Sequence, residues 1–339
     1  MQPLLETRDL NVSFATEQCT VPVVRGVDLK VGSGEIIGLV GESGSGKSVT
    51  CMAVMGLLDD NARLSGEIRW DGKQLNGQDD RIMSDFRGNE LAMIFQDPMS
   101  ALNPVQTVGK QLYEAIQLNA PGRLSRSELK RQAIKLLSDV GVPAPEARLK
   151  AYPHQLSGGL NQRVVIAMML AGEPRLLIAD EPTTALDVTV QAQILDLLRQ
   201  LRDQRGMSII LVTHDLGVVA ETCDRVVVMY CGRVVETGPI ESVFSNPRHP
   251  YTSGLLASLP RIDADDHKLT PIPGVVPQPH ELGEGCAFAP RCPNASSHCY
   301  SDSPAMLCSE ADHFFSCFTP MPTKFEHSDY EPTSNHCAL

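Results

Sequence analysis

The sequence has no uninterrupted apolar run of the roughly 20 residues that a helix needs to cross a bilayer. The longest candidate, Val164 to Ala171, is far too short. The N-terminal residues are polar and slightly acidic, without the basic and apolar regions of an export signal. We therefore expect neither a membrane-spanning segment nor export.

Positive charge is also scarce. The chain has 29 Lys and Arg against 41 Asp and Glu, which gives a net charge of −12. Because a general DNA or RNA binder presents a basic surface, nucleic acid is not an expected partner. Any role at a membrane must run through a protein partner rather than a basic face.

The 339 residues, 42% of them hydrophobic and 21% charged, suffice for one large core with a smaller appendix, or for two mid-sized domains. The ten cysteines are unevenly distributed, and six of them follow residue 285: Cys286, Cys292, Cys299, Cys308, Cys317 and Cys337. In a reducing compartment such a group is more often metal-binding or simply reduced than disulfide-bonded.

Strand and helix patterns alternate along the chain. The first 75 residues predict short strands, with Asp71-Gly72 as a hairpin turn. Continuous apolar runs typical of strands buried on both faces occupy residues 35–40, 176–180, 208–214 and 226–230. Helical periodicity fills residues 125–141, between a Ser cap and a Gly, and residues 188–201. This alternation predicts an α/β fold with a parallel, doubly wound sheet and an antiparallel layer beside it.

The composition changes near residue 245. Residues 271–285 are too rich in Pro and Gly for regular structure. We therefore divide the chain into a domain at residues 1–245 and a C-terminal module at residues 246–339.

A phosphate-binding loop is predicted at residues 41–48, which read GESGSGKS and fit the pattern G-x-x-x-x-G-K-[ST]. The loop follows a buried strand and opens a helical pattern. Its glycines let backbone N–H groups surround phosphates, and the helix N-terminus favours an anion. Lys47 is expected to reach the β- and γ-phosphates, and Ser48 to ligate Mg²⁺. The expected phosphate-binding residues are Gly41, Ser43, Gly44, Ser45, Gly46, Lys47 and Ser48.

Two carboxylates, Asp180 and Glu181, lie at the C-terminal end of the apolar strand at residues 176–180, where ligands of α/β sheets bind. Asp180 is suited to the Mg²⁺ shell. Glu181 is placed to polarise an attacking water as general base. Alone, such a pair would be a solvated turn, but beside a phosphate loop it predicts nucleotide hydrolysis.

A second anion cradle is predicted at Ser157, Gly158 and Gly159, where a hydroxyl and two backbone N–H groups begin a helix. The segment LSGGLNQR resembles the LSGGQ-type signature of ABC ATPases. The resemblance implies a P-loop NTPase core with an antiparallel β-subdomain and a helical subdomain at about residues 97–165. It also implies that two subunits enclose two ATP molecules head to tail, each cradle closing over the partner's nucleotide. The turn also serves as a helix cap, and the two roles are compatible.

Other elements of that family occur in order. Gln96 matches the Q-loop, which senses Mg²⁺ or water and is coupled to the membrane partner, so the resemblance implies that Gln96 is catalytic and ligates Mg²⁺. His214 matches the switch histidine that contacts the γ-phosphate, which implies a catalytic role. Asp187 matches the D-loop, which crosses to the other subunit, and also fits a helix N-cap. Phe14 lies where the family stacks an aromatic ring on adenine, although many core strands carry a Phe.

Four segments resemble the dipeptide and oligopeptide importer ATPases within that family: residues 96–104, 152–159, 246–256 and 286–299. The resemblance implies an ATP-hydrolysing peripheral subunit at the cytoplasmic face of the inner (plasma) membrane. Its implied partners are a second ATPase subunit, with a heterodimer favoured, two transmembrane permease subunits and, indirectly, an extracytoplasmic solute-binding protein. Nickel, metallophores or glycosides are alternative solutes, and a non-transport ABC ATPase is a less favoured alternative.

The last cysteines form a candidate metal site. Cys286, Cys292, Cys299 and Cys317 lack the close C-x2-C pairs common at structural zinc sites, so spacing alone leaves metal and reduced thiols evenly balanced. The resemblance to peptide-importer ATPases implies a [4Fe–4S] cluster held by these four residues. Zinc is the alternative metal, and Cys308 is the alternative to Cys317.

Overall fold

The computed structural model describes residues 2–17, 19–78, 80–184, 186–259, 271–310 and 312–322, so Cys337 lies outside the described residues. A four-stranded antiparallel sheet has the order β2-β1-β4-β5. Its strands are β1 (Leu5–Ala15), β2 (Thr20–Val31), β4 (Ala62–Trp70) and β5 (Lys73–Gln74). The predicted hairpin turn lies at Asp71-Gly72, where Trp70 pairs with Lys73.

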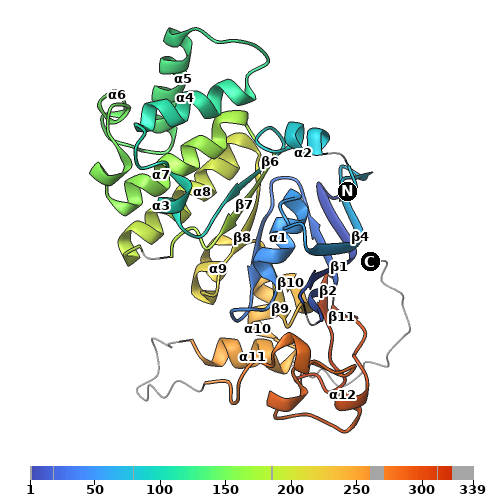
Figure 1. The fold of residues 1–339 in the computed structure, drawn as a ribbon. Coiled ribbons are helices and arrows are strands. Elements are labelled where there is room, and N and C mark those ends of the chain that lie inside the picture. The colour runs from blue at the N-terminus through green and yellow to red at the C-terminus, as the bar shows by residue number, and fades with distance from the viewer. Residues whose placement is uncertain are drawn as a thin grey trace.

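The larger sheet contains the strands that carry the predicted site. Its order is β11-β12-β10-β9-β3-β8-β7-β6 (Figure 1). The strands are β3 (Ile36–Val40), β6 (Leu91–Ile94), β7 (Leu176–Asp180), β8 (Ser208–Val212), β9 (Arg225–Tyr230), β10 (Arg233–Pro239), β11 (Leu307–Glu310) and β12 (His313–Phe315). The five strands from β9 to β6 run parallel, and β10, β12 and β11 are antiparallel additions. The predicted α/β class and four apolar strands are thus confirmed, whereas the short β6 carried no recognised signal.

Helices cover the sheet and form a separate layer. The described helices are α1 (Lys47–Met55), α2 (Asp80–Phe86), α3 (Pro98–Ala101), α4 (Val108–Asn119), α5 (Arg126–Asp139), α6 (Pro145–Arg148), α7 (Gly158–Met169), α8 (Val188–Arg205), α9 (Leu216–Thr222), α10 (Ile240–Ser245), α11 (Pro250–Ala257) and α12 (His298–Ser301). Short 3₁₀ turns occur at η1 (Pro153–Gln155), η2 (Leu170–Gly172), η3 (Pro279–Glu281) and η4 (Ala289–Arg291). Helices α3 to α7 lie together at the upper left of Figure 1, away from the antiparallel sheet.

Local signals account for the bounds of α5. Ser125 accepts the N–H of Glu128, whose carboxylate accepts the N–H of Ser125, so a capping box begins the helix. Gly141 follows the helix with φ of +71°.

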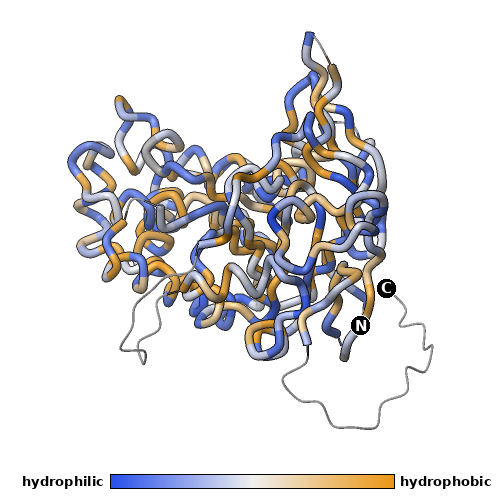
Figure 2. The backbone as a smooth tube through the Cα atoms, turned by 90° about the horizontal axis from the view of Figure 1, so that it is seen from below, coloured by the Kyte–Doolittle hydropathy of each residue, from blue (hydrophilic) through white to orange (hydrophobic). Residues whose placement is uncertain are grey.

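Within the described parts of the chain, no helix is both long and apolar enough to cross a bilayer, and Figure 2 shows polar and apolar residues mixed along the chain.

The segment after residue 245 is joined to the large sheet. Strand β12 pairs with β10, which follows β9 in the chain. A buried cluster combines Tyr230 at the end of β9 with Tyr251 of α11 and Phe288. The C-terminal segment therefore packs directly against the strand ends that position the phosphate loop.

Candidate active site

The phosphate loop connects β3 to α1 and is tightly enclosed. Gly41 has φ of +150°, and a Cβ there would lie 2.2 Å from the carbonyl oxygen of Met229. Gly46 has φ of +95°, and a Cβ there would lie 2.9 Å from the carbonyl oxygen of Val23 on β2. Glycine is needed at both positions because any side chain would be strained and would collide with backbone.

Lys47, the first residue of α1, points into this loop. Its Nζ donates to the carbonyl oxygens of Gly41 at 2.8 Å and Glu42 at 3.0 Å, and to Ser45 Oγ at 3.2 Å. Burial lowers the pKa of Lys47, although the charges of Glu181 and Asp180 oppose this shift. The ammonium thus lies where phosphate oxygens of a nucleotide would be its acceptors.

Asp180, the last residue of β7, is hydrogen-bonded to the side chain of Ser48 on α1. Burial raises the pKa of Asp180, and the bond with Ser48 opposes the rise. Two of the three predicted magnesium ligands, Ser48 and Asp180, therefore meet, whereas the third, Gln96, donates to Glu181. A hydroxyl and a carboxylate oxygen fit the all-oxygen shell that Mg²⁺ prefers.

Glu181 brings together the three residues predicted for catalysis. Its Oε2 accepts a hydrogen bond from Gln96 Nε2 at 2.7 Å, and its Oε1 lies 3.2 Å from His214 Nδ1. Gln96 follows β6, and His214 follows β8, so three adjacent strand ends contribute to one cluster. Thr184 Oγ1 donates to the same carboxylate at 2.9 Å, an interaction that no sequence pattern had indicated.

These partners control the charge and geometry of Glu181. Burial raises its pKa, but hydrogen bonds from His214, Thr184 and Gln96 outweigh burial and lower the pKa from its ordinary value. The residue has φ of +48°, in the left-handed region, and its N–H donates to the carbonyl oxygen of Val212 at 2.9 Å. Backbone strain of this kind is found at sites where a side chain must be aimed.

The predicted second cradle lies at the exposed start of α7. Ser157 caps the helix by accepting the N–H of Leu160 at 3.4 Å, and Gly158 and Gly159 form its first turn. A Cβ on Gly159 would lie 2.5 Å from Val190 Cγ1 of α8. Glycine is therefore needed at residue 159 for packing against α8, and anion binding by this turn stays a prediction.

Asp187 caps α8 by accepting the N–H of Val190 at 2.9 Å. Both Asp187 and Ser157 are exposed and bond their own helices rather than the phosphate loop. Beside Asp187, Val188 leaves 84% of its surface exposed. The hydrogen bonds of Ser157 and Asp187 thus cap α7 and α8, and both side chains remain exposed.

Phe14 lies on β1, half-buried, and pairs with Val21 of β2. Two residues further along β2, Val23 approaches Gly46 of the phosphate loop. This places Phe14 on the sheet beside the loop. Its stacking on adenine stays a prediction.

Sequence reasoning missed two residues, Arg291 and Tyr251, that bind Glu42 of the phosphate loop. Arg291 binds the Glu42 carboxylate at 2.6 and 3.1 Å, and the Tyr251 hydroxyl accepts the Glu42 N–H at 2.8 Å. Arg291 lies 249 residues and Tyr251 lies 209 residues from Glu42 in the chain, so no local pattern could pair them.

The four predicted cysteine ligands line one small cavity, together with His249, Phe288 and Phe318. The four are Cys286, Cys292, Cys299 and Cys317. Cys308 lies exposed on β11 and is not part of this lining. Burial raises the pKa of Cys286, Cys292 and Cys317. Among the residues that the structure describes, no three His, Cys, Asp or Glu side chains are grouped to hold a metal ion.

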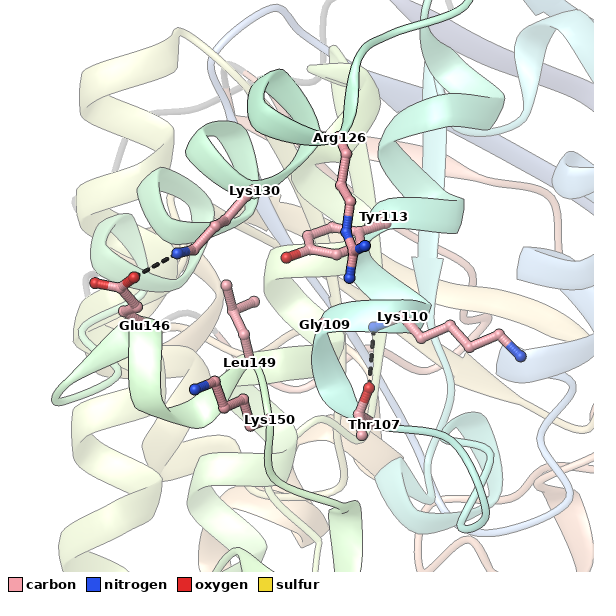
Figure 3. Close-up of a pocket in the computed structure, with 9 residues that line it drawn as sticks. All are labelled: Thr107, Gly109, Lys110, Tyr113, Arg126, Lys130, Glu146, Leu149 and Lys150. Atoms are coloured by element: carbon pink, nitrogen blue, oxygen red, sulfur yellow. Dashed lines mark hydrogen bonds and ion pairs between the residues drawn. The ribbon is translucent and has the colours of Figure 1, made fainter.

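A larger cavity, of about 610 Å³, lies in the helical layer between α4, α5 and α6 (Figure 3). Four cations line it: Lys110, Arg126, Lys130 and Lys150. Lys130 pairs with Glu146 at 2.5 Å. None of the predicted site residues lines this cavity, so it is separate from the phosphate site.

A phosphate loop, a strand ending in Asp180 and Glu181, and a signature turn on an exposed helix define an ATP-binding cassette. Residues 24–184 match the family model described as ABC transporter, and residues 235–299 match the oligopeptide/dipeptide transporter C-terminal region. The chain belongs to the ATP-binding proteins of the ABC transporter family that carry this C-terminal region.

Curated relatives support this assignment. The chain is 46% identical to the oligopeptide transport ATP-binding protein AppD of Bacillus subtilis, over 94% of this chain and 97% of the relative. It is 48% identical to the dipeptide transport ATP-binding protein DppD of Escherichia coli, over 89% and 92%. It is 51% identical to OppD of Mycobacterium tuberculosis over 94% of this chain, but spans only about half, 52%, of that relative.

Solved structures show the same fold. The ATP-binding cassette MJ0796, in a dimeric post-hydrolysis state bound to ADP and phosphate, matches with a TM-score of 0.63 and 27% identity. The match covers 70% of this chain and 98% of that one. The predicted P-loop core is therefore confirmed.

Proposed function

We propose that this chain is the ATP-hydrolysing subunit that energises a membrane importer of dipeptides or oligopeptides. The observation that carries the proposal is the Glu181 carboxylate, which is bound by Gln96 and faces His214. It lies beside Asp180, whose partner Ser48 follows Lys47 in the phosphate loop. Relatives named as oligopeptide and dipeptide transport proteins support the solute class.

Each group has a distinct role in hydrolysis. Lys47 binds the β- and γ-phosphates, and Ser48 and Asp180 hold Mg²⁺, which neutralises charge on the phosphates. Glu181 orients and deprotonates the attacking water. Because Gln96 and His214 share its carboxylate, they have to exchange partners as water and the γ-phosphate enter.

The site is completed by a second ATPase subunit, and we favour a heterodimer. Ser157 and Asp187 are exposed and cap their own helices, and Val188 next to Asp187 is exposed as well. A related cassette is dimeric in its ADP-bound and phosphate-bound structure. Each protomer thus supplies its cradle to the nucleotide of its partner.

A groove of about 450 Å³ next to Gln96 supports docking of two permease subunits. Its apolar lining comes from α1, β6, α4, α7 and the residues that follow α1 and β6: Met55, Leu57, Met93, Phe95, Leu118, Met168 and Met169. Phe95 and Leu118 are 44% and 79% exposed. Phe95 directly precedes Gln96, whose side chain binds Glu181. An apolar permease loop that packs on Phe95 in this groove would therefore be coupled to Glu181 through Gln96. The subunit would then lie peripherally at the cytoplasmic face of the inner membrane, and an extracytoplasmic binding protein would deliver solute.

Phe95→Glu combined with Leu118→Glu tests the transport role. A charge in the groove is costly to desolvate, so we expect the variant to retain ATP binding but to lose the two polytopic subunits that copurify with the wild type in detergent. Peptide uptake by cells should fall with the complex. Val275→Glu is the control, since Val275 is 84% exposed and outside the groove.

Two outcomes would contradict this function. Wild-type protein that copurifies with no membrane subunit would favour a non-transport ATPase. Uptake of nickel or a glycoside, but not of peptides, would assign the same machinery to another solute.

We further propose that the four cysteines hold a [4Fe–4S] cluster. A single zinc ion needs sulfur atoms about 2.3 Å from one point. The four thiols line one small cavity, and this shared lining is the observation that supports a common cluster. The cavity wall favours Cys317 over Cys308 as the fourth ligand, and zinc stays the alternative.

Serine at each of the four cysteines should remove bound iron from protein purified without oxygen, because four thiolates are needed to hold the cluster. Iron content and visible absorption measure the loss. Cys308→Ser is the matched control and should keep its iron. A colourless, iron-free wild type would refute the cluster, and stoichiometric zinc in it would establish the alternative.

A further inference from the structure

Arg291 crosses from the C-terminal segment to the phosphate loop. Its side chain is only 4% exposed, and its two terminal nitrogens bind the two oxygens of Glu42 at 2.6 and 3.1 Å. Its Nε donates to the carbonyl oxygen of Pro273 at 2.9 Å, and Nη1 lies 3.3 Å from the Tyr230 hydroxyl. Such a bidentate pair with a buried guanidinium fixes both the position and the direction of the Glu42 carboxylate.

Tyr251 holds the backbone of the same residue. Its hydroxyl oxygen accepts the N–H of Glu42 at 2.8 Å. Its ring is fully buried, and the centroid of this ring lies 4.6 Å from the ring centroid of Tyr230 and 5.4 Å from the ring centroid of Phe288. Glu42 is therefore held at its backbone and at its side chain by two segments outside the nucleotide motif.

The support for Tyr251 extends to strand β10. The Tyr251 N–H donates to His249 Nδ1 at 3.0 Å. Glu236, fully buried on β10, accepts the N–H groups of Arg248 at 2.6 Å and His249 at 2.8 Å. This buried turn leaves Tyr251 little freedom to move relative to the sheet.

We infer that Arg291 and Tyr251 are positioning residues that hold the phosphate loop in the shape that binds nucleotide. This inference rests on the proposed ATPase function. The Glu42 carbonyl also accepts from Lys47 Nζ, so a shift of Glu42 displaces the lysine that binds phosphate. An unpaired Glu42 carboxylate would also repel the nucleotide, and Arg291 neutralises it.

The pairing connects nucleotide binding to the cysteine segment, because Arg291 lies between Cys286 and Cys292 in the chain. If the cysteine segment stabilises the nucleotide-binding shape of the phosphate loop, then by thermodynamic linkage bound nucleotide must stabilise the cysteine segment in return. Nucleotide should therefore slow amide hydrogen exchange in residues 286–292 of the full chain, and this protection should be lost when Arg291 is replaced.

Arg291→Met is the test of the side-chain contact. We expect the Kd of the full-length protein for Mg–ATP, measured with a fluorescent ATP analogue, to rise about tenfold or more, because a carboxylate next to the phosphates loses its partner. Turnover at saturating ATP should fall by a smaller factor than the affinity, because Gln96 and His214 keep their contacts with Glu181. The increase in Kd relative to the wild type should become smaller as the salt concentration rises, because salt screens the unpaired Glu42 charge.

Three further variants separate positioning from a general structural defect. Glu42→Gln in the Arg291→Met background should recover most of the affinity, and Arg291→Lys should recover part of it. Tyr251→Phe removes only the hydroxyl and should weaken binding a few-fold. Arg175→Met is the matched control, because Arg175 binds Asp71 through both terminal nitrogens and lies over the Trp70 ring on another part of the surface.

The outcomes are distinguishable. Unchanged nucleotide affinity in folded Arg291→Met overturns the inference and leaves the ATPase function standing. If Arg291→Met does not fold, unchanged affinity in both Arg291→Lys and Tyr251→Phe overturns it instead. A wild-type protein that neither binds nor hydrolyses ATP when assembled would refute the proposed function itself.

Discussion

Glu181→Gln should reduce steady-state ATP hydrolysis about a thousandfold while Mg–ATP stays bound. The amide has nearly the shape of the carboxylate but cannot accept a proton from water, and general-base catalysis contributes on the order of 10²–10⁴ in rate. Lys47, Ser48 and Asp180 are unchanged, so the nucleotide keeps its phosphate and magnesium contacts. Phosphate release measures the rate, and gel filtration with ATP should show the assembled form accumulating.

Glu67→Gln is the control for this substitution. Glu67 is an accessible carboxylate paired with Arg69 on β4, remote from the phosphate loop. Its removal should leave turnover within about twofold, as expected for a surface ion pair. If Glu181→Gln hydrolysed ATP at the wild-type rate, Glu181 would lose the role of general base.

Ser157→Arg should lower turnover about a hundredfold or more without weakening nucleotide binding to the same chain. Among the described residues, the Ser157 hydroxyl accepts the N–H of Leu160 in its own helix, so replacing Ser157 should leave the phosphate loop intact. In the assembled pair it would face the partner's γ-phosphate, where loss of one donor costs about 10²–10³ in rate. The measurement compares analogue affinity and phosphate release in the same preparations.

Ser125→Arg is the matched control, because Ser125 also caps an exposed helix start. Either substitution sacrifices a cap, which costs about 1 kcal/mol of stability. Only Ser157→Arg should stop turnover. In a homodimer, mixing it with Lys47→Ala would restore one intact pocket, whereas full activity in a strictly monomeric protein would contradict the shared-pocket arrangement.

Local features of the sequence determined much of this protein. The loop at residues 41–48, the apolar run ending at Asp180 and the capped helix after Ser125 all form where their patterns predict. Each depends on contacts between residues a few positions apart, such as helix capping, strand burial and glycine conformation. Side-chain periodicity and loop chemistry carry that information directly.

Only the tertiary structure decided how separate segments meet. It brought Gln96 and His214 to the Glu181 carboxylate, added β12 to the large sheet and selected Cys317 rather than Cys308 for the cysteine cavity. It also placed Arg291 against Glu42. Such pairs depend on how sheets and loops pack in space, and residues 249 positions apart leave no periodic trace in the sequence.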